Sequence, residues 1–256
     1  MNIFVFDIET VPDVESGRRI LQLSDSLSDK EVAKILYARA FKRSGTEFVS
    51  HHLHKIVAIS GVLRSGESLK VWSLGEKKSC EKELIERFFD GISRFTPNLV
   101  SWNGSGFDLP VIHYRALLHG VVSPRYWDNG EEDRSFRFNN YLSRYHQRHI
   151  DLMDALSGYQ PRAFSKLDEV ATMLGFPGKI GMDGSQVWGA YCDGEIDEIR
   201  GYCETDVLNT YLIFLRFEFM RGHLSKTAYD WECSFVQKTL QGKGKSHFDA
   251  FLEAWV

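Results

Sequence analysis

The sequence predicts an α/β fold with a mixed five-stranded sheet flanked by helices. Short apolar segments rich in β-branched and aromatic residues are typical of buried strands. These segments are 1–6, 55–63, 68–74, 98–102 and 149–153. Longer segments with apolar residues at helical spacing alternate with them, which is the order expected of an α/β fold. The clearest of these are 81–95, 109–119 and 195–221.

The first half of the chain predicts three strands and one long excursion. The apolar run 1–6 indicates a buried strand. Residues 11–54 then leave the sheet and contain a helix over 29–40, which Ser28 or Asp29 would cap. Residues 55–63 and 68–74 form a hairpin across the turn 64–67.

The second half predicts alternating helices and strands. The helix 81–95 carries apolar residues at the spacing of one face, and the strand 98–102 and the helix 109–119 follow it. Residues 121–149 have weak periodicity and predict irregular structure near the site. The strand 149–153 comes next, and helices are expected at 165–174, 195–221 and 225–240, before the Gly/Lys-rich link 242–245.

Composition limits the class of protein. The 256 residues are enough for one large domain, 1–256, with the excursion 11–54 and a C-terminal helical extension, 222–256. A hydrophobic content of 43% and a charged content of 26% indicate a globular protein without a membrane-spanning segment. Because the first strand starts at the N-terminus, no secretory leader is expected. Four scattered cysteines without a Cys-x-x-Cys pair favour the cytoplasm and argue against a zinc or disulfide framework.

Two carboxylates follow the first apolar run, in the motif Asp7-Ile8-Glu9. Alternate side chains of a strand share a face, so Asp7 and Glu9 point the same way while Ile8 points into packing. Two buried carboxylates side by side are unfavourable unless a positive charge lies between them. Oxygen ligands favour Mg²⁺ or Mn²⁺, so the motif predicts a divalent cation.

Two further motifs place acidic residues on helices. Asp108 follows the turn 103–107 and opens the predicted helix 109–119, a usual position for a site at a strand end in an α/β fold. Tyr202 and Asp206 are four residues apart on one face of the helix 195–221. Each motif alone is common; their order and local structure together predict a two-metal site.

The order Asp-x-Glu, Asp, then Tyr-x-x-x-Asp resembles the DEDDy 3′–5′ exonucleases, the family of the proofreading domains of DNA polymerases. The chain is most similar to stand-alone bacterial proteins related to the exonuclease domain of B-family polymerases, from residue 1 to about residue 220. The resemblance implies a ribonuclease H-like fold. It also implies metal-dependent 3′–5′ hydrolysis of single-stranded nucleic acid, expected to be DNA, to nucleoside 5′-monophosphates.

The resemblance further implies a role for each motif residue. Two Mg²⁺ or Mn²⁺ ions would clamp the scissile phosphate. Asp7 would bridge both ions, and Glu9 and Asp206 would complete the ion that activates water. Asp108 would support the ion at the leaving 3′-oxygen, and Tyr202 would orient the attacking water.

Five other residues are candidate substrate contacts, and alternatives stay open for most of them. Phe107 suits either stacking on a terminal base or core packing. Asn103 either holds its loop or touches the nucleotide, and Lys179 either contacts a phosphate or belongs to a plain loop. Lys166 is a phosphate candidate, and Thr10 adjoins the first motif.

Other signals indicate what the protein does not bind. The Gly-rich stretch 175–185 lacks the spacing of a P-loop, so no nucleotide cofactor is expected. His51, His52 and His54 lack a matching ligand cluster and indicate a loop before a strand rather than a metal site. The net charge of −4 does not decide the substrate, because a nuclease needs only a local positive groove.

Two alternatives to a DNA exonuclease remain at the level of sequence. The same chemistry on RNA would make the protein an exoribonuclease, and the same fold without activity would make it a nucleic-acid-binding module. The expected partner is a single-stranded or frayed 3′ end, and any proofreading or DNA-repair role would act in trans. The sequence leaves the oligomeric state open.

Overall fold

The computed structural model describes residues 2–255 and contains one five-stranded mixed sheet in the order β3-β2-β1-β4-β5. β1 pairs antiparallel with β2 and parallel with β4, while β2–β3 is antiparallel and β4–β5 is parallel. The strands are β1 (Asn2–Pro12), β2 (His54–Ser65), β3 (Ser68–Ser73), β4 (Asn98–Ser101) and β5 (His149–Asp151). The mixed α/β sheet predicted from the sequence is confirmed.

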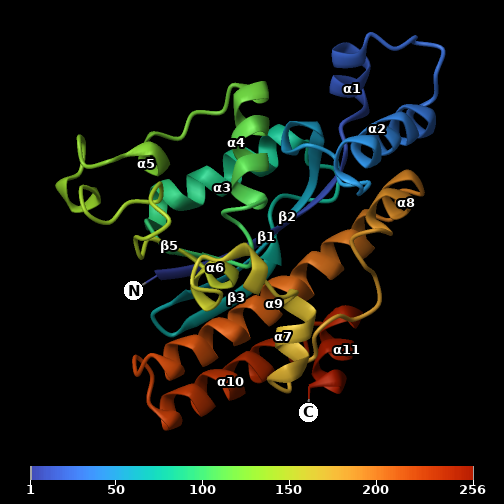
Figure 1. Ribbon diagram of the computed structural model, residues 1–256. Helices are drawn as coiled ribbons and strands as arrows, with labels where there is room; N and C mark the ends of the chain where they lie inside the picture. The colour runs from blue at the N-terminus through green and yellow to red at the C-terminus, as the bar shows by residue number, and fades with distance from the viewer. Residues whose placement is uncertain (1, 256) are drawn as a thin grey trace.

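Helices cover both faces of this sheet (Figure 1). One face packs against α3 (Glu81–Phe95), α4 (Asp108–His119) and the short α5 (Pro124–Trp127) through one apolar cluster. The other face packs against the 25-residue helix α9 through a second cluster. The helices on that second face are α7 (Leu167–Met173), α9 (Ile196–Met220), α10 (Lys226–Leu240) and α11 (Ser246–Ala254).

The central strand β1 divides its side chains between the two layers. Phe6 and Ile8 belong to the cluster with α3 and α4, while Val5 belongs to the cluster with α9. Asp7 and Glu9 follow Val5 on the same face because the side-chain period of a strand is two residues. The predicted orientation of the motif is therefore confirmed, and two carboxylates interrupt an apolar row that faces α9.

The first strand is longer than the sequence indicated. Met1 lies outside the described residues, and β1 continues past Phe6 to Pro12 because β2 pairs with it along that whole length. Asp7 and Glu9 thus lie inside the strand rather than at its end. The parallel neighbour β4, however, pairs with β1 only as far as Val5. The two carboxylates therefore lie just beyond the end of β4, which leaves room for a side chain from α4.

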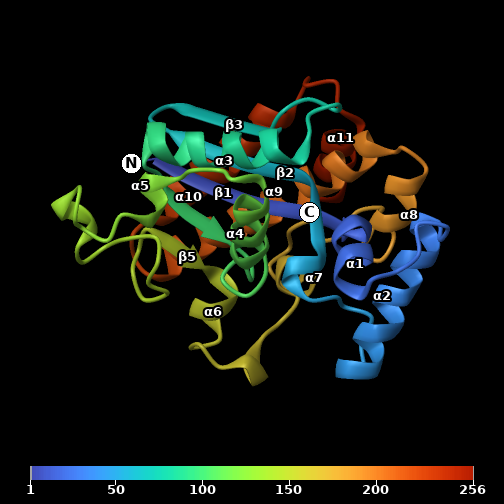
Figure 2. The same ribbon diagram turned by 90° about the horizontal axis from the view of Figure 1, so that it is seen from above.

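The excursion between β1 and β2 contains two helices instead of one (Figure 2). The unpredicted α1 (Val14–Leu21) packs on α2 (Asp29–Ser44), where a Cβ on Gly17 would lie 2.9 Å from Leu36. That glycine permits the close approach of the two helices but weakens the helical pattern of α1. Ser28 caps α2 in a capping box with Glu31, as predicted, and α2 continues beyond residue 40 to Ser44.

The second half follows the prediction with local changes. Residues 121–149 are irregular apart from α5 and the 3₁₀ turn 134–136. The fifth strand ends at Asp151, whose side chain caps the short α6 (Leu152–Leu156). α8 (Val187–Cys192) was not predicted. It lacks a start signal in the sequence, since no side chain caps its N-terminus. In the part of the chain that the structure describes, no helix combines the length and apolar character needed to cross a bilayer.

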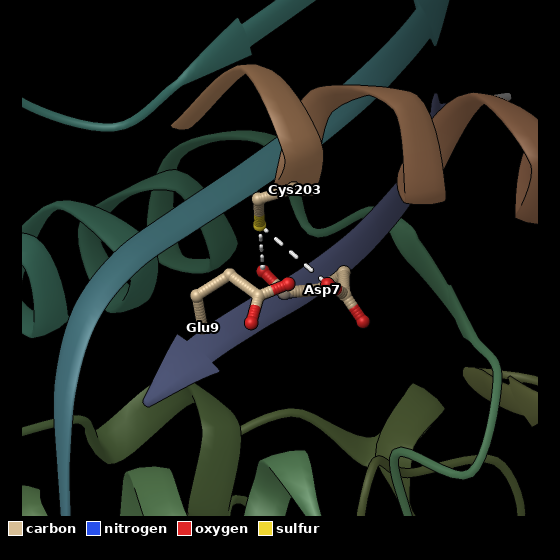
Figure 3. A group of neighbouring side chains, drawn as sticks. All are labelled: Asp7, Glu9 and Cys203. Atoms are coloured by element: carbon tan, nitrogen blue, oxygen red, sulfur yellow. Dashed lines mark hydrogen bonds between the residues drawn. The ribbon is translucent and has the colours of Figure 1, made fainter. Parts of the chain in front are cut away.

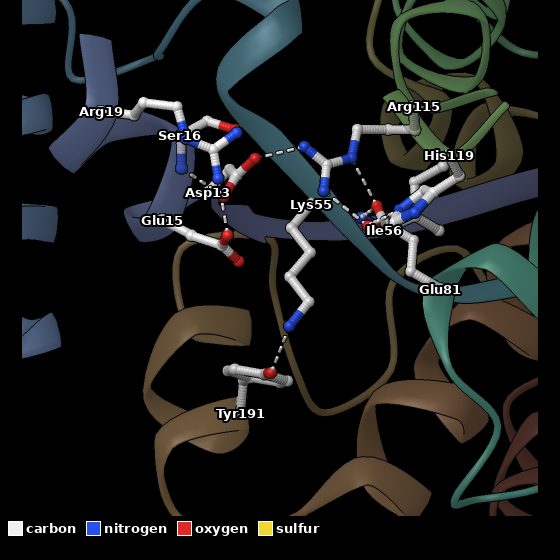
Figure 4. Close-up of polar contacts among 10 residues, drawn as sticks. All are labelled: Asp13, Glu15, Ser16, Arg19, Lys55, Ile56, Glu81, Arg115, His119 and Tyr191. Atoms are coloured by element: carbon white, nitrogen blue, oxygen red, sulfur yellow. Dashed lines mark hydrogen bonds and ion pairs between the residues drawn. The ribbon is translucent and has the colours of Figure 1, made fainter. Parts of the chain in front are cut away.

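A buried ionic network fixes α4 relative to β1 (Figure 4). The Arg115 guanidinium of α4 donates to both carboxylate oxygens of Glu81 at 2.7 and 2.5 Å, and it also pairs with Asp13. The Glu81 carboxylate additionally accepts from the backbone N–H of Ile56 in β2 at 2.6 Å. The three charged side chains are each at most 5% exposed. The network thus joins the end of β1, β2, α3 and the helix that begins at Asp108.

Candidate active site

Asp7 and Glu9 of β1 face Cys203 of α9 (Figure 3). One carboxylate oxygen of each acid and the Cys203 Sγ all lie within 4.8 Å of one another. The thiol lies 3.5 Å from Asp7 Oδ2 and 3.5 Å from the Asp7 carbonyl oxygen. Glu9 is only 8% exposed, so its carboxylate has little access to bulk water.

Asp108 reaches the same place from the other layer. It is the first residue of α4, and its Oδ1 accepts the backbone N–H of Ile8, between the two β1 acids, at 3.1 Å. The preceding turn is held by Asp151, which accepts the backbone N–H groups of Asn103 at 2.9 Å and of Ser105 at 2.8 Å. A Cβ at Gly104 would clash with the Ser101 side chain, so glycine permits the tight turn.

Tyr202 and Asp206 approach from α9. They are one turn apart, as predicted, and the Tyr202 hydroxyl lies near enough to the Asp206 carboxylate to lower the pKa of that carboxylate. The charge of Asp206 acts on both Asp7 and Glu9. The structure therefore brings together all five motif residues predicted from the sequence.

The cluster is electrostatically unfavourable as a set of four anions. Burial, and then the neighbouring carboxylates, raise the pKa values of Asp7 and Glu9 well above their usual range. Burial raises the pKa of Asp108 to about 7, although backbone N–H groups oppose the rise. Burial likewise raises the pKa of Asp206 to about 7, although the nearby Tyr202 hydroxyl opposes the rise. Converging groups with perturbed pKa values are typical of functional sites.

The donor set is suited to divalent cations. Four carboxylates offer hard oxygen ligands, which Mg²⁺ and Mn²⁺ prefer. A bound cation would offset the repulsion that raises their pKa values, because a nearby positive charge favours the ionised form. Asp7, Glu9, Asp108 and Asp206 are the residues that could hold such ions.

Lys179 supplies the positive charge that acts on two of these acids. Its ammonium lowers the pKa values of Glu9 and Asp206. The loop that carries it is fixed to α9, since the Asn209 side chain accepts from Gly178 N at 3.1 Å and donates to Gly178 O at 2.7 Å. Lys179 is 41% exposed, so it can also meet a ligand that enters the site.

Phe107 and Thr10 are engaged with the excursion. The Phe107 ring packs against the core and against Phe48 and His54, at centroid distances of 5.3 and 5.0 Å. The Thr10 hydroxyl hydrogen bonds to His54 Nδ1 at 2.8 Å. Both residues border the cluster, and both have contacts within the protein.

The remaining candidates differ in their placement. Asn103 adopts a left-handed backbone (φ 62°) and its carbonyl accepts from the N–H groups of residues 106 and 107, so it holds its loop. Lys166 is exposed just before α7, and within residues 2–255 no hydrogen bond or ion pair links it to the cluster. His51 contacts Gly106 O at 2.8 Å and His54 contacts Thr10, so these imidazoles serve the loop rather than one shared ion.

Three residues that shape the site received no defined role from the sequence. Cys203 faces the carboxylates, and its position three residues before Asp206 on one helix face was the signal that could have revealed it. Asp151 and Asn209 act through backbone hydrogen bonds to loops distant in sequence. Such pairings have no periodic signature.

Comparison with known proteins agrees with this geometry. Residues 46–255 match a family described as "Predicted 3'-5' exonuclease related to the exonuclease domain of PolB". The chain belongs to this family. The DNA polymerase of Archaeoglobus fulgidus is similar to it, with 26% identity over 149 residues. That alignment covers 57% of the chain but only 19% of the polymerase, so the chain spans a small part of that relative's length.

The family match covers part of the cluster. It includes Asp108, Tyr202 and Asp206, and it begins after Asp7 and Glu9. The two β1 acids are joined to the others by the fold, through the contacts with Ile8 and Cys203 described above. This family of predicted 3′–5′ exonucleases therefore supplies the class of reaction, and the structure supplies the arrangement.

Proposed function

We propose that the protein is a metal-dependent 3′–5′ exonuclease that hydrolyses single-stranded DNA to nucleoside 5′-monophosphates. The observation that carries the proposal is the convergence of four carboxylates from β1, α4 and α9, two buried and two half-buried, beside one tyrosine hydroxyl. The family match supports the direction of digestion, and the similarity to a DNA polymerase favours DNA.

The four acids divide the binding of two Mg²⁺ or Mn²⁺ ions. Asp7, on which the other three acids all act, would serve both ions. Glu9 and Asp206 would serve one, and Asp108 would serve the other. When bound, such ions stabilise negative charge on the phosphate and activate water. Asp108 is held by the Ile8 N–H and by a helix that the Arg115 network fixes, so its carboxylate needs little reorganisation.

Tyr202 orients the attacking water. Burial, and then the charges of Asp206 and the β1 acids, raise the pKa of its hydroxyl far above the ordinary value, so the hydroxyl keeps its proton. A protonated phenol donates and accepts hydrogen bonds but does not act as a general base near neutral pH. Lys179, exposed beside Glu9 and Asp206, contacts a phosphate of the strand.

A cavity of 380 Å³ next to the Asp108 loop accommodates the strand. It is lined by Asn103, Gly106, His113, Arg144 and Phe164, among others. Phe164 is 39% exposed, and an aromatic ring there offers a stacking surface for a base. A larger hollow of 940 Å³ lies around Arg115, but the charges that line it largely pair with one another. The smaller cavity is the better candidate because its wall includes the turn that precedes Asp108 and Leu109, which follows it.

The test is degradation of a single-stranded oligonucleotide labelled at its 5′ end, in parallel with an identical one labelled at its 3′ end. With Mg²⁺ or Mn²⁺ we expect a ladder that shortens from the 3′ end and immediate release of a labelled mononucleotide from the 3′-labelled strand. Excess EDTA should stop the reaction. The Asp7→Asn variant is the control for contaminating nucleases.

Matched substrates decide the remaining alternatives. Equal or faster digestion of RNA would indicate an exoribonuclease, because discrimination depends on contacts near the 2′-hydroxyl. Binding without cleavage under every metal condition would indicate a non-catalytic binding module. Cleavage that persists in EDTA would refute the metal-dependent mechanism.

A further inference from the structure

The proposed hydrolysis leaves one group at the centre of the site without a role. Cys203 is fully buried, and its Sγ lies 3.5 Å from Asp7 Oδ2, facing the carboxylates from α9 (Figure 3). The thiol, one Asp7 oxygen and one Glu9 oxygen lie within 4.8 Å of one another. One sulfur and two oxygens therefore converge on a small volume.

The spacing of these donors suits a tetrahedral cation. Zn–S bonds of about 2.3 Å and Zn–O bonds of about 2.1 Å at a tetrahedral angle place sulfur and oxygen about 3.6 Å apart. The observed separation between Cys203 Sγ and Asp7 Oδ2 is 3.5 Å. An ion bound to both atoms would thus require little movement of either side chain, and water could occupy the fourth position.

The chemistry of the donors distinguishes between cations. Carboxylates alone suit Mg²⁺ and Mn²⁺, whereas a thiolate selects softer ions such as Zn²⁺ and Cd²⁺. We propose that Cys203 joins Asp7 and Glu9 in a second binding mode of this site, which captures Zn²⁺ or Cd²⁺ in competition with the activating ions. Binding through sulfur displaces Asp7 and Glu9 from their role in hydrolysis, so these ions inhibit.

The binding step needs no oxidant. The S–H bond breaks, a metal–sulfur bond forms, the proton passes to the buffer, and the ion loses coordinated waters. The competing explanation is that the Cys203 thiol only donates a hydrogen bond to Asp7 and fills space, since it also packs in an apolar cluster with Val11, Ala58 and Ile199. Inhibition depends on the proposed function, whereas ion capture by sulfur does not.

The experiment is a titration of metal-free protein with Cd²⁺, followed by the ultraviolet charge-transfer band of the cadmium–thiolate bond. The exposed Cys80 and Cys192 are replaced by serine in every sample, because exposed thiols would contribute their own signal. Cys203→Ser is compared with the matched control Cys233→Ser, which removes a partly buried thiol from α10. Circular dichroism checks folding, and Cys203→Ala replaces the serine variant if that variant does not fold.

We expect one equivalent of Cd²⁺ to produce the band in the parent protein and in Cys233→Ser, and no band in Cys203→Ser. Cd²⁺ affinity, measured by calorimetry, should fall by at least about tenfold in Cys203→Ser, with a much smaller change for Mn²⁺. Absence of the band in the parent protein, or an equal band in Cys203→Ser, would overturn the proposal. A protein that gives the band but cleaves no oligonucleotide would refute the proposed nuclease and leave the sulfur site standing.

Discussion

Removing divalent ions and raising the pH from about 5 to about 8 is expected to destabilise the protein. The perturbation acts on Asp108 and Asp206, whose pKa values are both raised to about 7 in the folded protein. Between the unfolded value, near 4, and 7, the folded state binds more protons than the unfolded state. Stability therefore falls as the pH rises through this window and levels off above about pH 7.

The size of this loss of stability can be worked out for a single carboxyl group. A pKa that moves from 3.8 to about 7 on folding corresponds to a loss of about 4 kcal/mol once the group is ionised in both states. The two carboxyls are coupled, so their contributions do not simply add. About 3 kcal/mol of this loss falls between about pH 5 and about pH 8, because at about pH 5 the carboxyl of the unfolded chain is already largely ionised. For a chain of this size, about 3 kcal/mol corresponds to a decrease in Tm of roughly 5 to 10 °C.

Thermal unfolding in EDTA across this pH range measures the effect, with a parallel series in Mn²⁺. Binding of Mn²⁺ to the folded state should restore stability, by about 2.7 kcal/mol when the free ion is at 100 times its Kd. The matched control is Asp206→Asn, which removes one titrating group and should flatten the EDTA curve. Because asparagine has nearly the same shape as aspartate, this substitution removes the charge and preserves the packing beside Tyr202.

A stability in EDTA that is constant or rises between about pH 5 and pH 8 would refute the electrostatic argument. So would an equal slope in EDTA and in saturating Mn²⁺, because the ion is argued to offset this repulsion. A flat profile in the parent protein would mean that water reaches the carboxylates more freely than their burial indicates.

Asp7→Asn should raise the stability of the metal-free protein, measured by thermal unfolding, because it relieves repulsion among the carboxylates. The same substitution removes the ligand proposed to serve both ions, so it should lower the single-turnover rate, measured by quench kinetics, by more than about 100-fold. Tyr202→Phe should keep the fold and Mn²⁺ affinity but lower kcat, by about 2–4 kcal/mol of barrier, and a wild-type kcat would reduce Tyr202 to packing. Lys179→Met and Phe164→Ala should each raise KM more than they lower kcat in steady-state assays, since both are proposed to contact the strand. An unchanged KM would remove them from the binding surface. Arg115→Met should lower the free energy of unfolding, measured in urea, by about 3–5 kcal/mol, because it leaves buried carboxylates unpaired. A decrease below about 1 kcal/mol would contradict the role of Arg115 in the ionic network.

Much of the fold could be predicted because its elements obey local rules. The strands and long helices have the two-residue and 3.6-residue periods that burial on one or two faces imposes. The failures occur where a distant partner decides the structure. β1 extends beyond Phe6 because β2 provides backbone partners as far as Pro12, and α1 forms although Gly17 weakens its pattern.

The residues of the site also divide into those that local patterns predict and those that distant partners determine. Asp7, Glu9, Asp108, Tyr202 and Asp206 could be predicted because a motif marks each of them and the local structure orients it. Whether they do chemistry stays a proposal, since the arrangement supports that role without testing it. Their shared location depends on β4 ending at the level of Val5, and this is a property of the sheet register.

The residues that are hardest to predict from the sequence are those whose chemical role depends only on their neighbours in the folded protein. Cys203 belongs to an apolar helix face, so its pattern in the sequence is that of a packing residue, and only its spacing from Asp206 associates it with the site. Only the strand opposite, where two acids occupy positions that would otherwise be apolar, places its sulfur beside Asp7. The same burial that makes a thiol a good packing residue also brings it within reach of any ion that the carboxylates attract. A site built from a strand and a packed helix therefore acquires a ligand through core packing, and its preference among metals depends on a side chain that no acidic motif includes.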